Sequence, residues 1–235
     1  GKGGSGRGGA RGAMVAAMAS SPGLAAGFGN FHTHTRHCDG RGEVRDFAEA
    51  AIRRGMPRIG FSGHNVVPFP AAWTMPAANL PGYLADVRDA EQVFAGRLEV
   101  YLGMEVDYIP GVASPREPAI RALGLDYVIG SVHFLCPVDG AWDWTVDGSA
   151  AELAHGIARC YDGSARRMAE AYYARVAEML LQSVPDVVGH FDLLKKHNRK
   201  GELFSEDEPW YRAAALTALE AVARSGSILE VNTGG

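Results

Sequence analysis

The sequence has few cysteines and no long apolar run, and each shortage excludes a class of protein. No stretch approaches the length that a bilayer requires, which argues against a membrane-spanning chain and for a soluble one. The three cysteines, Cys38, Cys136 and Cys160, are odd in number and contain no CxxC pair. We therefore expect neither a disulfide framework nor a zinc ribbon, and we predict a reducing cytoplasmic location.

The chain also lacks an excess of positive charge, because its formal net charge is −4. This disfavours nucleic acid and anionic lipid as partners, although a local anion pocket is compatible with it. Three catalytic signatures are absent as well: a GxSxG elbow, a P-loop, and a GxGxxG motif after a strand. Serine-dependent acyl transfer, nucleoside triphosphate binding and dinucleotide binding thus lose their usual support.

The first 27 residues lack acidic side chains and are rich in glycine and alanine. We predict that residues 1–27 form a low-complexity, disordered leader, and we keep an organelle-targeting segment as the alternative. The remaining chain is ordinary in composition, and 47% of all residues are hydrophobic, which suits one globular domain over residues 28–235.

From residue 28 onward, short β-rich runs alternate with longer helical patterns. Apolar residues at helical spacing predict four helices. The first covers 43–55, the second follows a Pro-rich loop (66–82) and ends at about residue 95, and the others cover 149–181 and 205–225. Capping boxes, SAAE at Ser149 and SEDE at Ser205, are expected to open the last two. Such alternation predicts an α/β fold with a parallel sheet, most simply a barrel. The predicted strands are 28–33, 57–64, 97–108, 125–134, 185–190 and 227–232.

Histidine and glutamate recur where these predicted strands end. In α/β barrels the carboxyl ends of the strands converge on one face, so we expect such side chains to lie together. Histidine and carboxylate ligands suit zinc, manganese or iron, and a bridging glutamate can hold two ions. Two adjacent ions favour hydrolysis of a phosphate ester by a metal-bound hydroxide. The residues at the strand ends are His32, His34, His64, Glu105, His133 and His190.

Six motifs, in this order, carry a resemblance to a known family: HTHTRHCDG, GFSGHN, GMEVDY, GSVHFL, GHFDLLKKHN and LEVNTGG. Together they resemble the polymerase-and-histidinol-phosphatase (PHP) superfamily, specifically its histidinol-phosphate phosphatase branch. The resemblance implies a distorted, TIM-like (βα)7 barrel with two or three divalent ions. It also implies hydrolysis of the small-molecule phosphate ester L-histidinol phosphate to L-histidinol and phosphate, a late step of histidine biosynthesis.

The resemblance assigns metal ligands residue by residue. It implies that His32 and His34 bind a first ion, that Glu105 bridges, and that His133 and His190 bind a second ion. For a third ion it implies His64 and Asp39, although the Asp-Gly pair at 39–40 is equally a plain turn signal. The predicted catalytic residues are Glu105, His133 and His64, and the candidates for holding the substrate phosphate are Lys195 and Arg199.

One family feature is missing from this sequence. Family members end their barrel with a seventh strand that bears Asp-x-His, and this chain contains no such motif after its sixth predicted strand. We therefore expect a barrel without its seventh strand, whose open edge would invite a homodimer. Two alternatives to histidinol-phosphatase activity follow: a PHP-type phosphoesterase with another phosphomonoester substrate, or a catalytically silent metal-binding scaffold.

Other polar and aromatic residues have simpler interpretations. We expect His37, His155 and His197 at the surface, and Cys38 as a buried or half-exposed thiol. Asp107, two residues beyond Glu105 on the same strand face, either orients a metal ligand or faces solvent. The loop tryptophans are predicted to anchor packing, with an aromatic lid over an imidazole-bearing substrate as the alternative; they are Trp73, Trp142 and Trp144.

Overall fold

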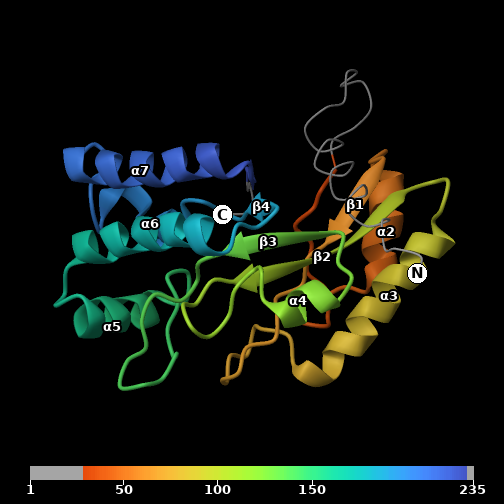
Figure 1. The fold of residues 1–235 in the computed structure, drawn as a ribbon, viewed down its shortest axis with the longest axis horizontal. Helices are drawn as coiled ribbons and strands as arrows, with labels where there is room; N and C mark the ends of the chain where they lie inside the picture. Colours follow the sequence, from red (N-terminus) through yellow and green to blue (C-terminus); the bar gives the residue numbers. More distant parts are fainter. Residues whose placement is uncertain (1–28, 232–235) are drawn as a thin grey trace, which may run out of the picture. The chain divides into compact units, whose positions relative to one another are not determined.

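The structure is a computed structural model of the 235-residue chain, and it describes residues 29–231 (Figure 1). The predicted leader, residues 1–27, lies outside the described residues. The described chain divides into two compact units. The first unit contains residues 29–66, 72–105 and 119–128, and the second contains 67–71, 106–118 and 129–231.

In the first unit, two parallel strands are joined through helices. Strand β1 (Arg58–Phe61) pairs in parallel with the start of β2 (Glu99–Asp107), with Arg58 opposite Glu99. Helix α2 (Val44–Arg53) precedes β1, and α3 (Leu80–Val93) lies between the two strands in the sequence. The prediction of α2 is confirmed: Val44, Ala48 and Ala51 are buried at helical spacing, and Gly55 follows its end with a φ of 68°.

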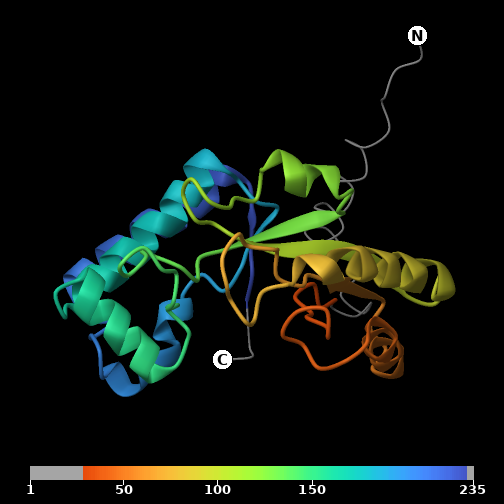
Figure 2. The ribbon, with the colours of Figure 1, turned by 90° about the horizontal axis from the view of Figure 1, so that it is seen from below.

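The second unit continues the parallel arrangement. Strand β3 (Tyr127–Ser131), which begins in the first unit, pairs with β4 (Val187–Val188), and β4 pairs with β5 (Ile228–Leu229). Three helices belong to this unit: α5 (Ala150–Cys160), α6 (Ala165–Gln182) and α7 (Pro209–Ser225). Both views show the three helices grouped together, with α6 packed along α7 (Figures 1 and 2).

Parallel strands and intervening helices confirm the α/β class. Among residues 29–231 the structure contains five strands, and the (βα)7 barrel without its seventh strand stays a prediction. The sequence did not predict the short helices α4 (Pro118–Ala122), η1 (Ala77–Asn79), η2 (Leu193–His197) and η3 (Arg199–Gly201). Within the described part of the chain, no helix is long and apolar enough to cross a membrane.

Three predicted elements differ from the structure. The single helix expected over 149–181 is broken between α5 and α6, where Asp162 and Gly163 have φ values of 51° and 75° and Ser164 caps the second helix. Helix α7 begins at Pro209, with Glu208 as its N-cap. The Ser205 hydroxyl accepts a hydrogen bond from the nearby Asp207 amide, so the predicted capping box at Ser205 does not open this helix. Residues 29–33 form no strand, only a bridge between Asn30 and Ile59.

The cysteine prediction was wrong. Cys136 and Cys160 form a disulfide that joins the loop after β3 to the last residue of α5. Cys38 is the free cysteine and is partly buried, as predicted. The spacing of 24 residues gave no CxxC signal, because only the fold brings the two thiols together.

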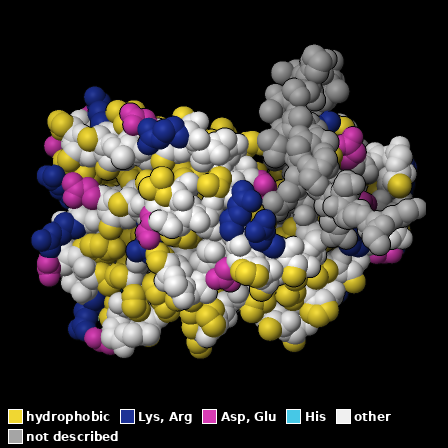
Figure 3. Space-filling view, viewed as in Figure 1, with side chains coloured by type: hydrophobic (Ala, Val, Ile, Leu, Met, Phe, Trp, Pro, Cys, Tyr) yellow, Lys and Arg dark blue, Asp and Glu magenta, His cyan; other side chains and the backbone are white. Residues whose placement is uncertain are grey.

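Charged side chains on the visible surface do not form a field of one sign. On the face in Figure 3, lysine and arginine side chains are interspersed with acidic ones over the helices of the second unit. This mixture of signs agrees with the small net charge of −4.

Candidate metal-binding site

One carboxylate in the first unit is surrounded by three imidazoles. The Oε2 atom of Glu105 lies 3.1 Å from His32 Nε2, 3.1 Å from His34 Nε2, and 3.2 Å from His64 Nδ1. Glu105 is fully buried, and His64 is 5% exposed. We call these four residues together with Asp39 the Glu105 cluster.

Backbone hydrogen bonds explain why these side chains meet. The amides of Gly60 and Ser62 donate to the carbonyls of Asn30 and Thr33, which holds the stretch with His32 alongside β1. Farther along, the Glu105 amide donates to the Gly63 carbonyl, so His64 and Glu105 sit in a parallel bridge. The cluster residues therefore lie at the carboxyl ends of three neighbouring chain segments, which are residues 30–33, β1 and β2.

Asp39 completes the cluster from the turn at residues 36–39. Its Oδ1 lies 2.7 Å from His34 Nδ1, and its Oδ2 lies 3.9 Å from His64 Nε2. One ligand atom each from His34, Asp39 and His64 lies within 4.8 Å of the others, a spacing that suits a shared ion. This geometry agrees with two roles for Asp39: a direct metal ligand, or a carboxylate that orients His34.

The charges of the metal-free cluster are coupled. Burial lowers the pKa of His34, but the hydrogen bonds to Asp39 and Glu105 outweigh it and raise this pKa to about 9. Burial raises the pKa of Asp39, and the hydrogen bond from His34 outweighs that effect and lowers it to about 2. In the absence of metal, this pair is therefore an imidazolium and a carboxylate at neutral pH.

A divalent cation fits this donor set. If neutral His34 donates from Nδ1 to Asp39, its Nε2 lone pair faces the anionic Glu105 oxygen at 3.1 Å. Such a contact is unfavourable unless a cation, either a proton or a metal ion, lies between the two atoms. Imidazole nitrogens and carboxylate oxygens are the ligands that zinc, manganese and iron accept.

The second unit holds the other predicted ligands. The rings of His133 and His190 meet edge to face, with their centroids 4.9 Å apart. The Nδ1 atom of His133 lies 2.7 Å from Oδ1 of Asp107, and the amide of His190 donates to the Glu230 carboxylate. We call His133, His190 and Asp107 the His133 group. Five of the seven predicted ligands therefore lie in the Glu105 cluster, and the other two lie in the His133 group.

The sequence prediction missed Asp147. Burial raises the pKa of this carboxyl, but electrostatic interactions with the nearby His133 and Lys196 and a hydrogen bond from Thr145 outweigh burial and lower it. The ammonium of Lys196 also donates to the Asp147 carbonyl at 2.9 Å, which ties the loop before α5 to η2. Nothing in the local sequence VDGS marks this residue, because the loop conformation alone brings it to the histidines.

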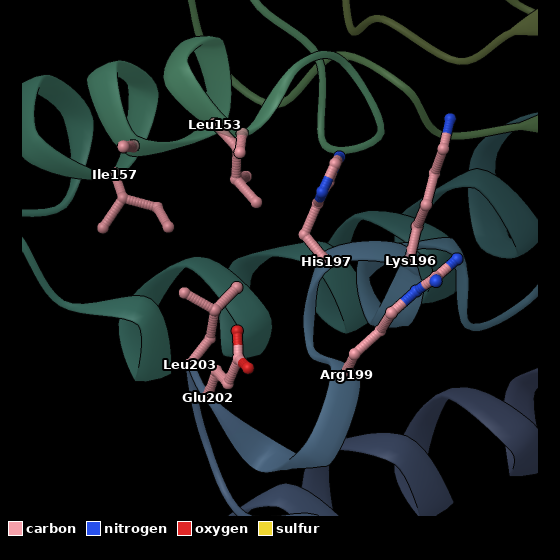
Figure 4. Close-up of a pocket in the computed structure, with 9 residues that line it drawn as sticks. Leu153, Ile157, Lys196, His197, Arg199, Glu202 and Leu203 are labelled. Atoms are coloured by element: carbon pink, nitrogen blue, oxygen red, sulfur yellow. The ribbon is translucent and has the colours of Figure 1, made fainter.

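The two candidates for phosphate binding have different surroundings. The Lys195 ammonium forms ion pairs with Asp192 at 3.2 Å and Glu206 at 3.0 Å. Arg199 instead lines a cavity of about 430 Å³ between α5 and residues 196–203. In Figure 4 the side chains of Lys196 and Arg199 extend in a similar direction, away from Leu153 and Ile157.

The structure also places the other histidines and the tryptophans. His37 is not at the surface: it is 8% exposed, and its Nε2 lies 2.7 Å from an Asp86 carboxylate oxygen. His155 is exposed as predicted, and His197 is partly buried.

Trp144 is a packing anchor, since its ring fills the space that a Cβ atom on Gly156 would need. The ring of Trp73 meets that of His64 edge to face at 4.5 Å, and Trp142 packs on Phe69 and Phe134.

Parallel strands, intervening helices and clustered histidines with carboxylates define an α/β protein with a candidate metal-binding site. Residues 30–234 match the PHP domain family. The chain belongs to this family.

Individual relatives agree with this assignment. A Deinococcus radiodurans protein named "Probable histidinol-phosphatase" is 37% identical over 207 residues, which cover 87% of this chain and 72% of that protein. The structure of a histidinol-phosphatase candidate from Listeria monocytogenes, hisK, has the same fold, with a TM-score of 0.75 and 22% identity over 88% of this chain and 83% of that one.

A third relative was crystallised with ligands. The structure of histidinol phosphate phosphatase from Lactococcus lactis contains zinc, L-histidinol and phosphate. It matches with a TM-score of 0.63 and 19% identity, over 87% of this chain and 73% of that one. At this identity the likeness establishes the shared fold.

Proposed function

We propose that this protein is a metal-dependent histidinol-phosphatase, which hydrolyses L-histidinol phosphate to L-histidinol and phosphate. The Glu105 cluster carries the proposal, because three imidazoles and a buried carboxylate oxygen at 3.1 to 3.2 Å form a donor set suited to divalent ions. The family membership and the name of the Deinococcus radiodurans relative support the choice of reaction.

In this proposal, the Glu105 cluster and the His133 group supply the ligands for two or three ions of zinc, manganese or iron. Bound ions would neutralise phosphate oxygens and make water a stronger nucleophile at neutral pH. The zinc in the Lactococcus lactis structure supports zinc as one of the metals. The proposed ligands are His32, His34, Asp39, His64, Glu105, His133 and His190.

The chain's own residues have two further tasks. Glu105, His133 and His64 are the proposed catalytic residues, and their burial limits access of bulk water to the reacting phosphate. A cationic side chain must also hold the phosphate, and we propose Arg199 before Lys195 for this task. The carboxylates of Asp192 and Glu206 already occupy the Lys195 ammonium, which weakens its attraction for a further anion.

Location and assembly remain predictions. We propose a cytoplasmic enzyme, in keeping with the absence of a membrane-spanning helix among the described residues. The Cys136–Cys160 disulfide counts against this location, because disulfides are rare in reducing compartments. A homodimer likewise stays a prediction.

The test is phosphate release from L-histidinol phosphate by the zinc- or manganese-loaded protein. We expect Glu105→Gln to abolish release, because the substitution replaces the charged carboxylate at the centre of the cluster. Glu99→Gln is the matched control, since Glu99 lies on the same strand but is exposed, and this variant should keep full activity.

Three results would contradict parts of this proposal. Full activity in Glu105→Gln would show that the reaction does not depend on the Glu105 cluster. Equal rates with unrelated phosphomonoesters would favour a less specific PHP-type phosphoesterase. Absence of hydrolysis in folded, metal-loaded protein would favour the metal-binding scaffold.

A further inference from the structure

Strand β2 places a second buried carboxylate two residues after Glu105. Asp107 is fully buried, as is Val106 between the two acidic residues. Because side chains alternate along a strand, Asp107 shares a face with Glu105 and not with Val106. Burying a carboxylate is unfavourable unless hydrogen bonds compensate, so the partner of Asp107 must explain its position.

That partner is one nitrogen of a proposed metal ligand. Oδ1 of Asp107 lies 2.7 Å from Nδ1 of His133, and His133 itself is 4% exposed. We assign the Nδ1–H group of His133 as the donor and the carboxylate oxygen of Asp107 as the acceptor in this contact. We infer that Asp107 is a positioning residue, which holds the proton of neutral His133 on Nδ1, so that Nε2 is the nitrogen that would bind a metal ion.

The inference has a physical consequence for metal binding. A neutral imidazole can carry its proton on either nitrogen, and binding through Nε2 requires the Nδ1–H form. Without the Asp107 carboxylate, the Nδ1–H tautomer of His133 would lose this hydrogen bond, and the Nε2–H tautomer would become more populated. Loss of such an outer carboxylate typically costs 10- to 100-fold in metal affinity or activity. The inference rests on the proposed metal-dependent function, but the tautomer itself can be observed without metal or substrate.

The first test uses the unaltered chain. In metal-free protein labelled with 15N-histidine, imidazole nitrogen–proton correlations report which ring nitrogen carries the proton, at a pH above the ordinary imidazole value of about 6.5. We expect His133 in the Nδ1–H form, assigned through the signal lost in His133→Gln. His37 is an internal reference for the other tautomer, Nε2–H, because its Nε2 lies 2.7 Å from an Asp86 carboxylate oxygen. An Nε2–H form of His133 would overturn the inference.

The second test removes the charge of Asp107. We expect Asp107→Asn to weaken zinc binding by about 10- to 100-fold in competition with a chromophoric chelator, and to mix the two tautomers of His133. The matched control is Asp126→Asn, because Asp126 binds Arg88 and the Leu102 amide and touches no proposed ligand. This control can lower the melting temperature but should leave zinc affinity unchanged.

The outcomes separate this inference from the proposed function. Unchanged zinc affinity and an unchanged tautomer in Asp107→Asn would show that Asp107 only stabilises the fold, and would overturn the inference. A weakened zinc site in a protein that releases no phosphate from L-histidinol phosphate would support the inference while the proposed function fails. If Asp107→Asn does not fold, the tautomer measured in the unaltered chain decides.

Discussion

The Glu105 cluster and the His133 group contain the same residue types but use their carboxylates in opposite ways. In the Glu105 cluster the carboxylate is central, and three imidazole nitrogens converge on one of its oxygens. In the His133 group the carboxylate of Asp107 lies behind a single imidazole, on its Nδ1 side. The comparison teaches that the role of a buried carboxylate depends on which imidazole nitrogens face it.

The largest expected effect tests this difference directly. Glu105→Gln should lower zinc affinity by more than about 100-fold, which exceeds the loss that removal of an outer carboxylate causes. The physical reason is that the Oε2 atom of Glu105 lies within 3.2 Å of three proposed ligands, whereas Asp107 acts on the metal site through His133. Equilibrium competition with a chelator would measure both variants, and equal losses in Glu105→Gln and Asp107→Asn would contradict the distinction.

The second prediction concerns the Cys136–Cys160 disulfide of the second unit. The described residues of the first unit contain no disulfide. Reduction of Cys136–Cys160, or the Cys160→Ser substitution, should lower the free energy of unfolding by about 3 kcal/mol, because the closed loop restricts the unfolded chain. Urea unfolding with and without reductant would measure the loss. Cys38→Ser is the control and should leave the reductant effect intact. Three free thiols in mass spectrometry of the folded protein would contradict the disulfide.

The smallest effect is a pH dependence confined to the metal-free Glu105 cluster. The pKa of His34 is raised from 6.5 to about 9, so its proton stabilises the fold below pH 6.5, and this contribution is lost as the pH rises to about 9. The pKa of Asp39 is lowered from 3.8 to about 2, so its contribution is present above pH 3.8 and is lost as the pH falls to about 2.

Between pH 6 and 9, the metal-free protein should therefore lose about 1 to 2 kcal/mol of stability, a value discounted because Asp39 is 40% exposed. The His34→Gln variant should lack most of this loss, since it cannot carry the proton. Urea unfolding of both proteins in chelator at several pH values would measure the difference. Identical pH profiles would show that the His34–Asp39 pair does not couple to folding.

Sequence patterns predicted the fold where the cause of structure was local. The apolar spacing of α2, its glycine after the last turn, and the Ser149–Glu152 capping box all appear as expected. The break between α5 and α6 was missed because the apolar periodicity resumes after Asp162 and Gly163, so a window across both helices resembles one helix. The disulfide was missed because it depends on how the loop after β3 folds onto α5.

The candidate site shows the same limit. Parallel strands end at a common edge, so histidine and glutamate at predicted strand ends were identifiable from the sequence alone. The sequence could not show whether Asp107 faces solvent or a histidine, since its partner His133 follows a different strand. Asp147 gave no signal, because a short loop before a capping serine carries many polar residues without chemical roles.

The spacing of Glu105 and Asp107 on β2 limits how this strand can change. Between and before them lie Val106 and Met104, which are 0% and 1% exposed. An insertion or deletion of one residue early in β2 would exchange the two faces of the strand. Both carboxylates would then enter apolar surroundings, while a valine and a methionine would meet the imidazoles. A change in the length of strand β2 by one residue would therefore remove both carboxylates from the histidines at once.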